Sequence, residues 1–159
     1  MSFQLAQADF LMRGSKFIDA PAMAQLSSSI QQMRRLAENA PGFVRSVNCG
    51  ISANSSWPLY RGHVIVNVCV WQDVEHFRDF VQFSSRQIFF ERARIEARMG
   101  SHTDLALWWI PEGSKPSTHD AAEALDSLNR VGPSANAFNL SCIFPPQSMY
   151  PTLDQKEAV

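Results

Sequence analysis

The chain of 159 residues lacks several features that would place it in a functional class at once. It has 14 basic and 15 acidic residues and a net charge of −1, so it has no excess of positive charge of the kind that nucleic acid binding requires. No apolar run is long enough to cross a membrane, and the N-terminal segment lacks the basic start and apolar core of a secretory signal. We therefore expect a soluble protein with no nucleic acid or membrane partner.

Motifs for nucleotide and metal chemistry are missing as well. The sequence has no glycine-rich phosphate loop, no GxSxG nucleophile elbow, no dinucleotide fingerprint and no histidine at a metal-binding spacing. We therefore expect no metal and no other cofactor. The three cysteines, Cys49, Cys69 and Cys142, are odd in number and widely spaced, which predicts buried reduced thiols and a cytoplasmic location.

The most informative segment is 63–83, where a pattern with a period of two changes into a helical one. In the expected strand His63–Trp71, four valines alternate with a mixed set of residues, so one face is uniformly apolar. The other face carries an amide, a thiol and an indole from Asn67, Cys69 and Trp71. We expect the functional site on this mixed face.

The remaining pattern predicts a single domain, with 45% hydrophobic and 18% charged residues. The expected elements are a strand at 3–10, a helix from Asp19 to 39–42, a strand at 43–49, a polar connection at 50–62, a strand at 63–71, a helix capped by Asp73, a helical stretch at 85–99, a strand at 103–110 and a helix from Ser117 to Arg130. This order is that of a ferredoxin-like α+β domain, a βαββαβ antiparallel sheet with helices on one face and an added C-terminal helix. We expect the domain to occupy residues 1–143 and a flexible tail to follow at 144–159.

A sheet that helices cover on one face leaves its other face bare. If four valines stayed exposed, the fold would lack several kcal/mol of hydrophobic stabilisation, at roughly 25 cal/mol per Å² of apolar surface. Two such sheets packed face to face would bury them, so we expect a homodimer.

Three stretches carry a resemblance to a known family: VNVCVWQDVEHFRDFV, LALWWIPEG, and an Ala-rich helix followed by Gly132-Pro133 and Ala137-Phe138. Over most of residues 3 to 140 the chain resembles domain of unknown function 3291, within the dimeric α+β barrel superfamily. The resemblance implies two sheets that form a barrel across a dimer, with each active site between a sheet and its own helices. The superfamily includes cofactor-free quinol monooxygenases, polyketide cyclases, muconolactone-type isomerases, haem-degrading monooxygenases and aldoxime dehydratases, and fold alone does not choose among them.

The chain departs from the family pattern at three positions. Members commonly have His where this chain has Arg86, Trp where it has Glu96, and His where it has Ser114. These differences put a mechanism that depends on His in question. They also make haem a less favoured ligand, because the helix position that should supply its axial ligand holds no His. Charges of both signs alternate along the same helix, which predicts a solvated face formed by Arg86, Glu91, Arg92, Arg94, Glu96 and Arg98.

Four polar residues are candidates for catalysis. An unpaired Asn67 amide in a valine-rich strand would cost on the order of 1–3 kcal/mol, so it has either a structural partner or a role in the site. Asp9 shares a strand face with Gln7, and both either converge with Asn67 or lie in solvent at a sheet edge. His76, in a first helical turn, is either a neutral base or a surface residue. Arg86 either binds an anionic or carbonyl oxygen or forms a surface ion pair.

Aromatic residues are candidates for the walls of a substrate pocket. Trp71 either lines the cavity or seals the corner between strand and helix. The adjacent Trp108 and Trp109 point to opposite faces of their strand, and Trp108 belongs to the mixed set of that strand, as Asn67 and Trp71 do in theirs. We therefore assign Trp108 to the cavity, together with Phe77, Phe80, Phe83 and Tyr60. Gln7 is a further candidate for contact with the substrate.

The sequence thus predicts a small-molecule enzyme of secondary metabolism. The expected chemistry is cofactor-independent cyclase, isomerase, lyase or monooxygenase action on a hydrophobic polyketide-, terpenoid- or quinone-like metabolite. Aromatic walls would enforce shape, a His or Asp would transfer a proton, and Asn67 or Arg86 would polarise an oxygen. The alternative is a non-catalytic module that binds a metabolite or haem.

Overall fold

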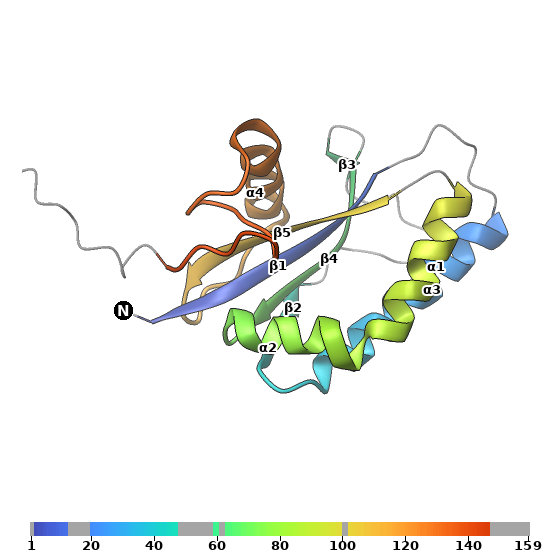
Figure 1. Cartoon of the computed structure of the whole chain (residues 1–159), viewed down its shortest axis with the longest axis horizontal. Helices are drawn as coiled ribbons and strands as arrows, with labels where there is room; N and C mark the ends of the chain where they lie inside the picture. Colours follow the sequence, from blue (N-terminus) through green and yellow to red (C-terminus); the bar gives the residue numbers. More distant parts are fainter. Residues whose placement is uncertain (1, 13–19, 48–58, 61–62, 100–101, 147–159) are drawn as a thin grey trace, which may run out of the picture.

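An antiparallel sheet with helices against both faces forms the centre of the protein in the computed structural model (Figure 1). The structure describes residues 2–12, 20–47, 59–60, 63–99 and 102–146. The strands are β1 (Phe3–Met12), β2 (Phe43–Val47), β3 (Leu59–Tyr60), β4 (His63–Trp71) and β5 (His102–Pro111). The helices are α1 (Ala20–Glu38), α2 (Val74–Asp79), a π-helical turn (Phe80–Ser84), α3 (Arg86–Met99) and α4 (Thr118–Val131).

The four long strands lie in the order β2-β4-β1-β5, and all neighbouring strands are antiparallel. The short β3 pairs with the start of β4 and was not expected from the sequence. Since α1 follows β1 and α2 and α3 follow β4, this order confirms the predicted ferredoxin-like α+β arrangement. It also places β1 and β4 at the centre of the sheet, so both strands are flanked on each side.

The strand register decides which side chains share a face of the sheet. Ala6 on β1 lies opposite Val70 on β4 and Trp108 on β5, and directly opposed residues project from the same face. Trp71 and Trp109 are the neighbours of these residues and therefore lie on the other face. The assignment of Trp108 to a cavity shared with Trp71 is wrong. The composition of one strand does not fix the register, and only pairing across strands shows which alternate set faces which helices.

Helix α4 covers the valine-bearing face of the sheet, on the side opposite α1, α2 and α3 (Figure 1). Val68 and Val70 are completely buried in one chain and pack in a cluster with Ala121, Ala124 and Leu125 of α4. A second subunit is therefore not needed to cover these two valines, contrary to the expectation of a bare face. The side chains of Val64 and Val66 lie outside the described part of the chain.

Capping interactions fix where two of the helices begin. The Ser117 hydroxyl accepts a hydrogen bond from Asp120 N at 3.0 Å, and an Asp120 carboxylate oxygen accepts one from Ser117 N at 2.8 Å. This reciprocal pair is a capping box, and it confirms the predicted start of the helix at Ser117. Asp73 caps α2 by accepting a hydrogen bond from His76 N at 2.9 Å, as its position predicted.

After α4 the chain returns to the edge of the sheet. Phe138 N donates to Leu107 O at 2.8 Å, Leu107 N donates to Phe138 O at 2.9 Å, and the Trp109 indole donates to Phe144 O at 2.7 Å. The division into a domain at 1–143 and a tail at 144–159 stays a prediction, and residues 147–159 lie outside the described ranges. Among the cysteines, the buried thiol of Cys69 matches the prediction, whereas Cys142 is exposed and Cys49 is not among the described residues.

Candidate functional site

Five polar side chains meet on the face of the sheet that is turned toward α3. Each belongs to a residue that is less than one tenth exposed, although all are charged or carry an amide. We call them the polar cluster; its members are Gln7 and Asp9 from β1, Asn67 from β4, and Arg92 and Glu96 from α3. The structure thus brings Gln7 and Asp9 together with Asn67, which is one of the two alternatives that the sequence left open. The catalytic roles of Asp9 and Asn67 and the substrate-binding role of Gln7 stay predictions.

The two central strands position Asp9 beside Asn67. These residues are directly opposed in the pairing of β1 with β4, and the Asp9 carboxyl is hydrogen-bonded by the side chains of Gln7 and Asn67. The register shifts immediately after Asp9, because Phe10 lies opposite Ile65. Such bulges bend a strand locally and re-aim its side chains, and they are frequent beside active sites.

Helix α3 contributes a buried ion pair that the sequence did not predict. Arg92 Nε lies 2.9 Å from Glu96 Oε1, one helical turn away, and the interpretation of both residues as part of a solvated face is wrong. A helical-period signal was present, because Ser85, Phe89, Arg92 and Glu96 follow one another at steps of four, three and four residues. Ser85 is completely buried and Phe89 packs against the core, so this stripe faces inward.

The environment of Asp9 favours its protonated form. Burial raises the pKa of Asp9, and the nearby Arg92 guanidinium opposes this most strongly. Hydrogen bonds from Gln7 and Asn67 also lower the pKa of Asp9, whereas the negative charge of Glu96 raises it. Together these effects leave the pKa of Asp9 above its ordinary value. A carboxyl group with a raised pKa can exchange a proton with a bound molecule closer to neutral pH than an exposed aspartate can.

Trp71 connects the polar cluster to an aromatic group. Its indole Nε1 donates to Gln7 Oε1 at 3.2 Å, and the side chain is completely buried. Ring centroids of Phe43, Phe77 and Phe80 lie 5.4, 5.5 and 5.0 Å from that of Trp71. Trp71 therefore fills the corner between β4 and α2 and also joins the cluster by a hydrogen bond. Beside it, the Cys69 thiol donates to Asn67 Oδ1 at 3.4 Å.

Phe83 and Arg86 lie on the outside of the helices, away from Trp71 and Phe80. Phe83 is 76% exposed, and the Arg86 guanidinium lies over the exposed ring of Phe90, 5.8 Å from its centroid. Together they line an external apolar groove, so the expectation that they face the same pocket as Trp71 is wrong. The π-helical turn explains the error. Because a π-helix is wider than an α-helix, Phe83 points in another direction than α-helical spacing from Phe77 and Phe80 predicts.

His76 is held at the start of α2 by a partner of its own. Its Nδ1 lies 2.7 Å from Asp73 Oδ1, and its ring packs over Gly42. Among the contacts of the described residues, none joins His76 to the polar cluster. His119, in the first turn of α4, is exposed and pairs with Glu123. The side chains of Tyr60, His63 and His102 lie outside the described ranges.

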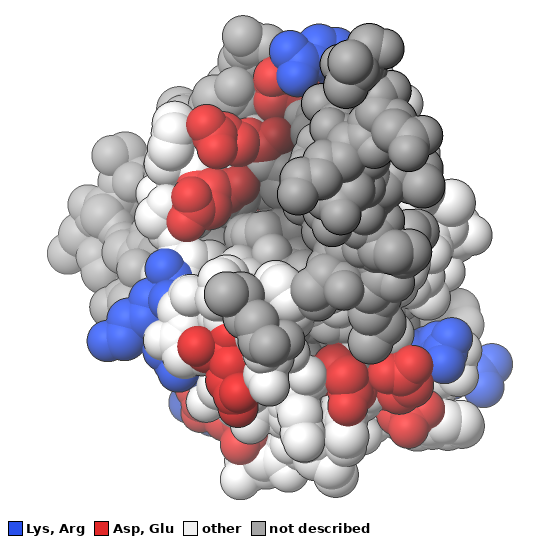
Figure 2. All heavy atoms as spheres, turned by 90° about the vertical axis from the view of Figure 1, so that its left-hand side faces the viewer, with Lys and Arg blue, Asp and Glu red and all other residues white. Residues whose placement is uncertain are grey.

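Charged side chains of both signs are spread over the face shown in Figure 2, with basic groups at its margins and acidic groups between them. In the part of the chain that the structure describes, no three His, Cys, Asp or Glu side chains are grouped to hold a metal ion. None of the described helices combines the length and the apolar character that crossing a bilayer demands.

The sheet order and the buried polar cluster define a ferredoxin-like α+β domain with a polar centre between sheet and helices. The chain belongs to the family described as Domain of unknown function (DUF3291), whose model matches residues 4–154. This match confirms the family resemblance of the sequence.

Solved structures with a similar fold include two of SnoaB, a cofactor-independent oxygenase from Streptomyces nogalater, one of them an asparagine-to-alanine mutant. They are 18% and 20% identical, cover 72% and 74% of this chain and 98% and 100% of SnoaB, and both have a TM-score of 0.44. A hydantoinase/carbamoylase family amidase from Burkholderia ambifaria is 18% identical, with 80% of this chain and 34% of the amidase covered and a TM-score of 0.33. No curated protein matches the chain. Likenesses this distant do not assign a reaction.

Proposed function

We propose that the protein is a small-molecule enzyme in which Asp9 transfers a proton to or from a hydrophobic substrate, without a cofactor. The single observation that supports this is a buried carboxyl group, with its pKa raised, held between two amides beside a tryptophan-centred aromatic group. A buried aspartate is costly for a fold, and perturbed carboxyl groups of this kind concentrate at functional sites.

The proposed mechanism begins with proton abstraction. A substrate with an acidic C–H or O–H group loses its proton to the Asp9 carboxylate, and an N–H of Asn67 donates to the oxygen on which negative charge develops. Arg92 takes the cationic role that the sequence assigned to Arg86, because it is the arginine that interacts with Asp9. Trp71, with Phe77 and Phe80 behind it, would hold a flat ring in place.

Cyclase, isomerase, lyase and monooxygenase reactions on a polyketide-, terpenoid- or quinone-like metabolite can each begin with this step. The proposal therefore concerns the shared proton transfer, and the reaction that follows depends on the substrate. In a monooxygenase, dioxygen would be the co-reactant that accepts the electrons of the substrate anion.

A solvent-exchange assay tests the shared step. The purified full chain is incubated in deuterated buffer with a panel of flat polycyclic phenols and quinols, and deuterium uptake at carbon is followed by mass spectrometry. We expect Asp9→Asn to lower the exchange rate by about 10²–10⁴-fold, the usual contribution of a positioned acid or base. The matched control is Glu75→Gln, on the exposed side of α2. A folded Asp9→Asn variant that exchanges at the wild-type rate would overturn the proposal.

The second candidate is a non-catalytic metabolite-binding module, favoured by the deep burial of every member of the polar cluster. This function predicts saturable binding of a panel compound with no deuterium uptake in either the wild type or Asp9→Asn. For haem, the discriminating measurement is a Soret band that develops on titration and saturates at one haem per chain.

We also propose that the chain forms a homodimer. With α4 covering Val68 and Val70, the apolar surface that supports this lies elsewhere: Phe83, Phe90 and Val131 are 76%, 60% and 64% exposed. Light scattering after gel filtration separates the mass of two chains, which we expect, from the mass of one. A cytoplasmic location also stays a prediction, and localisation of a tagged chain tests it.

A further inference from the structure

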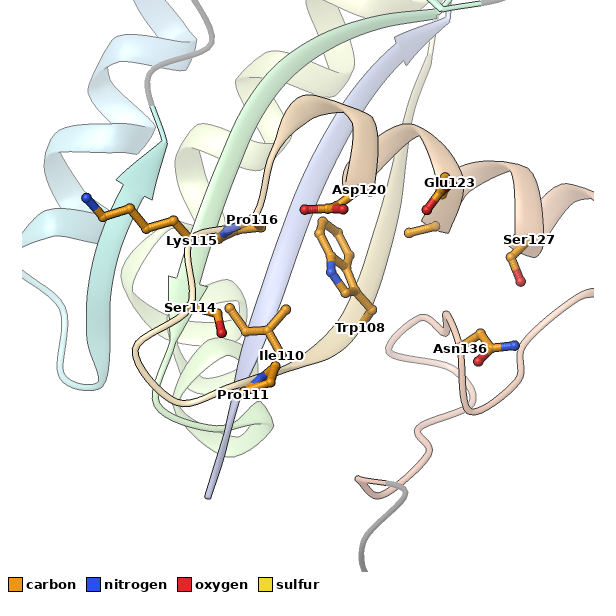
Figure 3. A pocket seen from close by; sticks show the side chains of 11 residues that line it. Trp108, Ile110, Pro111, Ser114, Lys115, Pro116, Asp120, Glu123, Ser127 and Asn136 are labelled. Carbon is orange, nitrogen blue, oxygen red and sulfur yellow. The ribbon is translucent and has the colours of Figure 1, made fainter. Parts of the chain in front are cut away.

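A cavity lies on the opposite side of the sheet from the polar cluster. It has a volume of about 460 Å³ and is bounded by the end of β5, the loop that follows, and the first turns of α4 (Figure 3). Trp108 and Ile110 on β5 supply apolar walls, and both are 7% exposed. Because the sheet separates this cavity from Asp9, nothing in the proposed proton transfer involves it.

Helix α4 lines the cavity with acidic and hydroxyl side chains at helical spacing. Asp120, Glu123 and Ser127 follow one another at steps of three and four residues, so they lie on one face of the helix. The carboxylate of Asp120 lies next to the Trp108 ring in Figure 3. Lys115 is also at the rim, but its side chain extends away from the cavity, so the side facing α4 carries negative charge (Figure 3).

Each of the two carboxylates retains capacity to bind a cation. The Asp120 carboxylate accepts one hydrogen bond, from Ser117 N, and a carboxylate has about four acceptor positions. Glu123 lies 3.1 Å from His119 Nε2, but both side chains are more than two thirds exposed, so solvent screens this pair. A bound ammonium group could therefore be shared by Asp120 and Glu123 without breaking a buried interaction.

The Trp108 indole provides an independent sign of a ligand. No hydrogen bond from its N–H to any described residue is recorded, although this residue is more than nine tenths buried and lines the cavity. Among the described residues the one fully buried side-chain nitrogen or oxygen without a partner is Arg34 Nε, so the Trp108 N–H is open to the cavity and free to donate to a bound molecule. A ligand oxygen in the cavity would satisfy it.

We propose that this cavity binds a small protonated amine that also carries an oxygen acceptor. The ammonium group is held by Asp120 and Glu123, the apolar body packs against Ile110 and Pro116, and the oxygen accepts from the Trp108 N–H.

Three probes with the same phenolic body test the charge requirement. Tyramine carries an ammonium group, 4-ethylphenol is neutral, and 3-(4-hydroxyphenyl)propanoate carries a carboxylate. Titration calorimetry on the full wild-type chain should show tyramine binding at least tenfold more tightly than 4-ethylphenol, with the propanoate weakest. Equal affinities, a preference for the propanoate, or no tyramine binding up to millimolar concentration would overturn the proposal.

Single substitutions locate the bound probe. Glu123→Gln should weaken tyramine binding about tenfold and leave 4-ethylphenol binding unchanged, whereas the exposed Glu75→Gln on α2 should affect neither. In nuclear magnetic resonance spectra, tyramine should shift the indole N–H signal that Trp108→Phe removes and leave the signal that Trp109→Phe removes. Unchanged affinity in a folded Glu123→Gln variant, or a shift confined to the Trp109 or Trp71 indole, would refute the assigned site.

Discussion

The side chains of Arg92 and Glu96 form an ion pair of 2.9 Å inside the protein, next to the buried carboxyl group of Asp9. Arg92 is 3% and Glu96 is 6% exposed, so neither charge is stabilised by bulk water. Their opposite effects on Asp9 make this pair the main charged influence on the proposed proton-transfer group. The pair lies on the inward face of α3, together with Phe89.

Removing one partner of the pair should destabilise the fold strongly. Arg92→Met or Glu96→Leu leaves the other side chain buried without its ion-pair partner, and we expect a loss of about 3–5 kcal/mol in the free energy of unfolding. The double variant Arg92→Met with Glu96→Leu should lose much less, because no unpaired charge remains. Urea unfolding of all four proteins measures the coupling, and purely additive losses would show that the two side chains do not form an energetic pair.

Asp9→Asn should stabilise the protein at neutral pH. The folded state raises the pKa of Asp9. The stability that the Asp9 carboxyl contributes is therefore complete below its ordinary pKa and is lost as the pH rises through its folded-state pKa. The asparagine variant does not titrate, so its advantage over the wild type should be small at pH 4 and larger at pH 8, by about 1.4 kcal/mol for each pKa unit of difference. Urea unfolding at both pH values provides the measurement, and a variant that is less stable at pH 8 contradicts the expectation.

Gly42→Ala should destabilise the connection between α1 and β2. Gly42 has φ +81°, and a Cβ atom there would overlap the ring of His76. The left-handed backbone alone costs an alanine about 1–2 kcal/mol. Adding His76→Ala should relieve the overlap and recover only part of the loss in thermal unfolding, with His76→Ala alone as the control. Full recovery would mean that backbone strain contributes nothing.

Asp73→Ala should cost about 0.5–2 kcal/mol by removing the N-cap of α2, whereas Asp73→Asn should retain most of the cap. Burial by itself would raise the pKa of Asp73, but hydrogen bonds and attraction from His76 outweigh it and lower that pKa. The stability from ionised Asp73 is therefore present above its ordinary pKa and is lost as the pH falls through the folded-state value. Thermal unfolding from pH 7 to pH 3 should show the gap between wild type and Asp73→Ala narrowing, and a gap that widens toward acid would contradict this sign.

Much of the fold follows from local signals in the sequence. The start of α2 at Asp73 and of α4 at Ser117 depends on hydrogen bonds between residues three apart, which a sequence displays directly. The alternation of valines with a mixed set of residues predicts the strand His63–Trp71. Convergence of Gln7 and Asp9 with Asn67 could be considered because the sequence shows which residues of each strand share a face.

What the sequence determined by itself is the order of the elements and the set of residues that each strand presents together, because both depend on contacts within a few residues. Tertiary structure alone decided that Trp108 faces α4, that Arg92 and Glu96 are buried, and that the π-helical turn places Phe83 outside. These outcomes depend on strand register and on the rotation of a helix against the sheet. Both are set by packing between segments that are distant in the chain, and no local pattern encodes that packing.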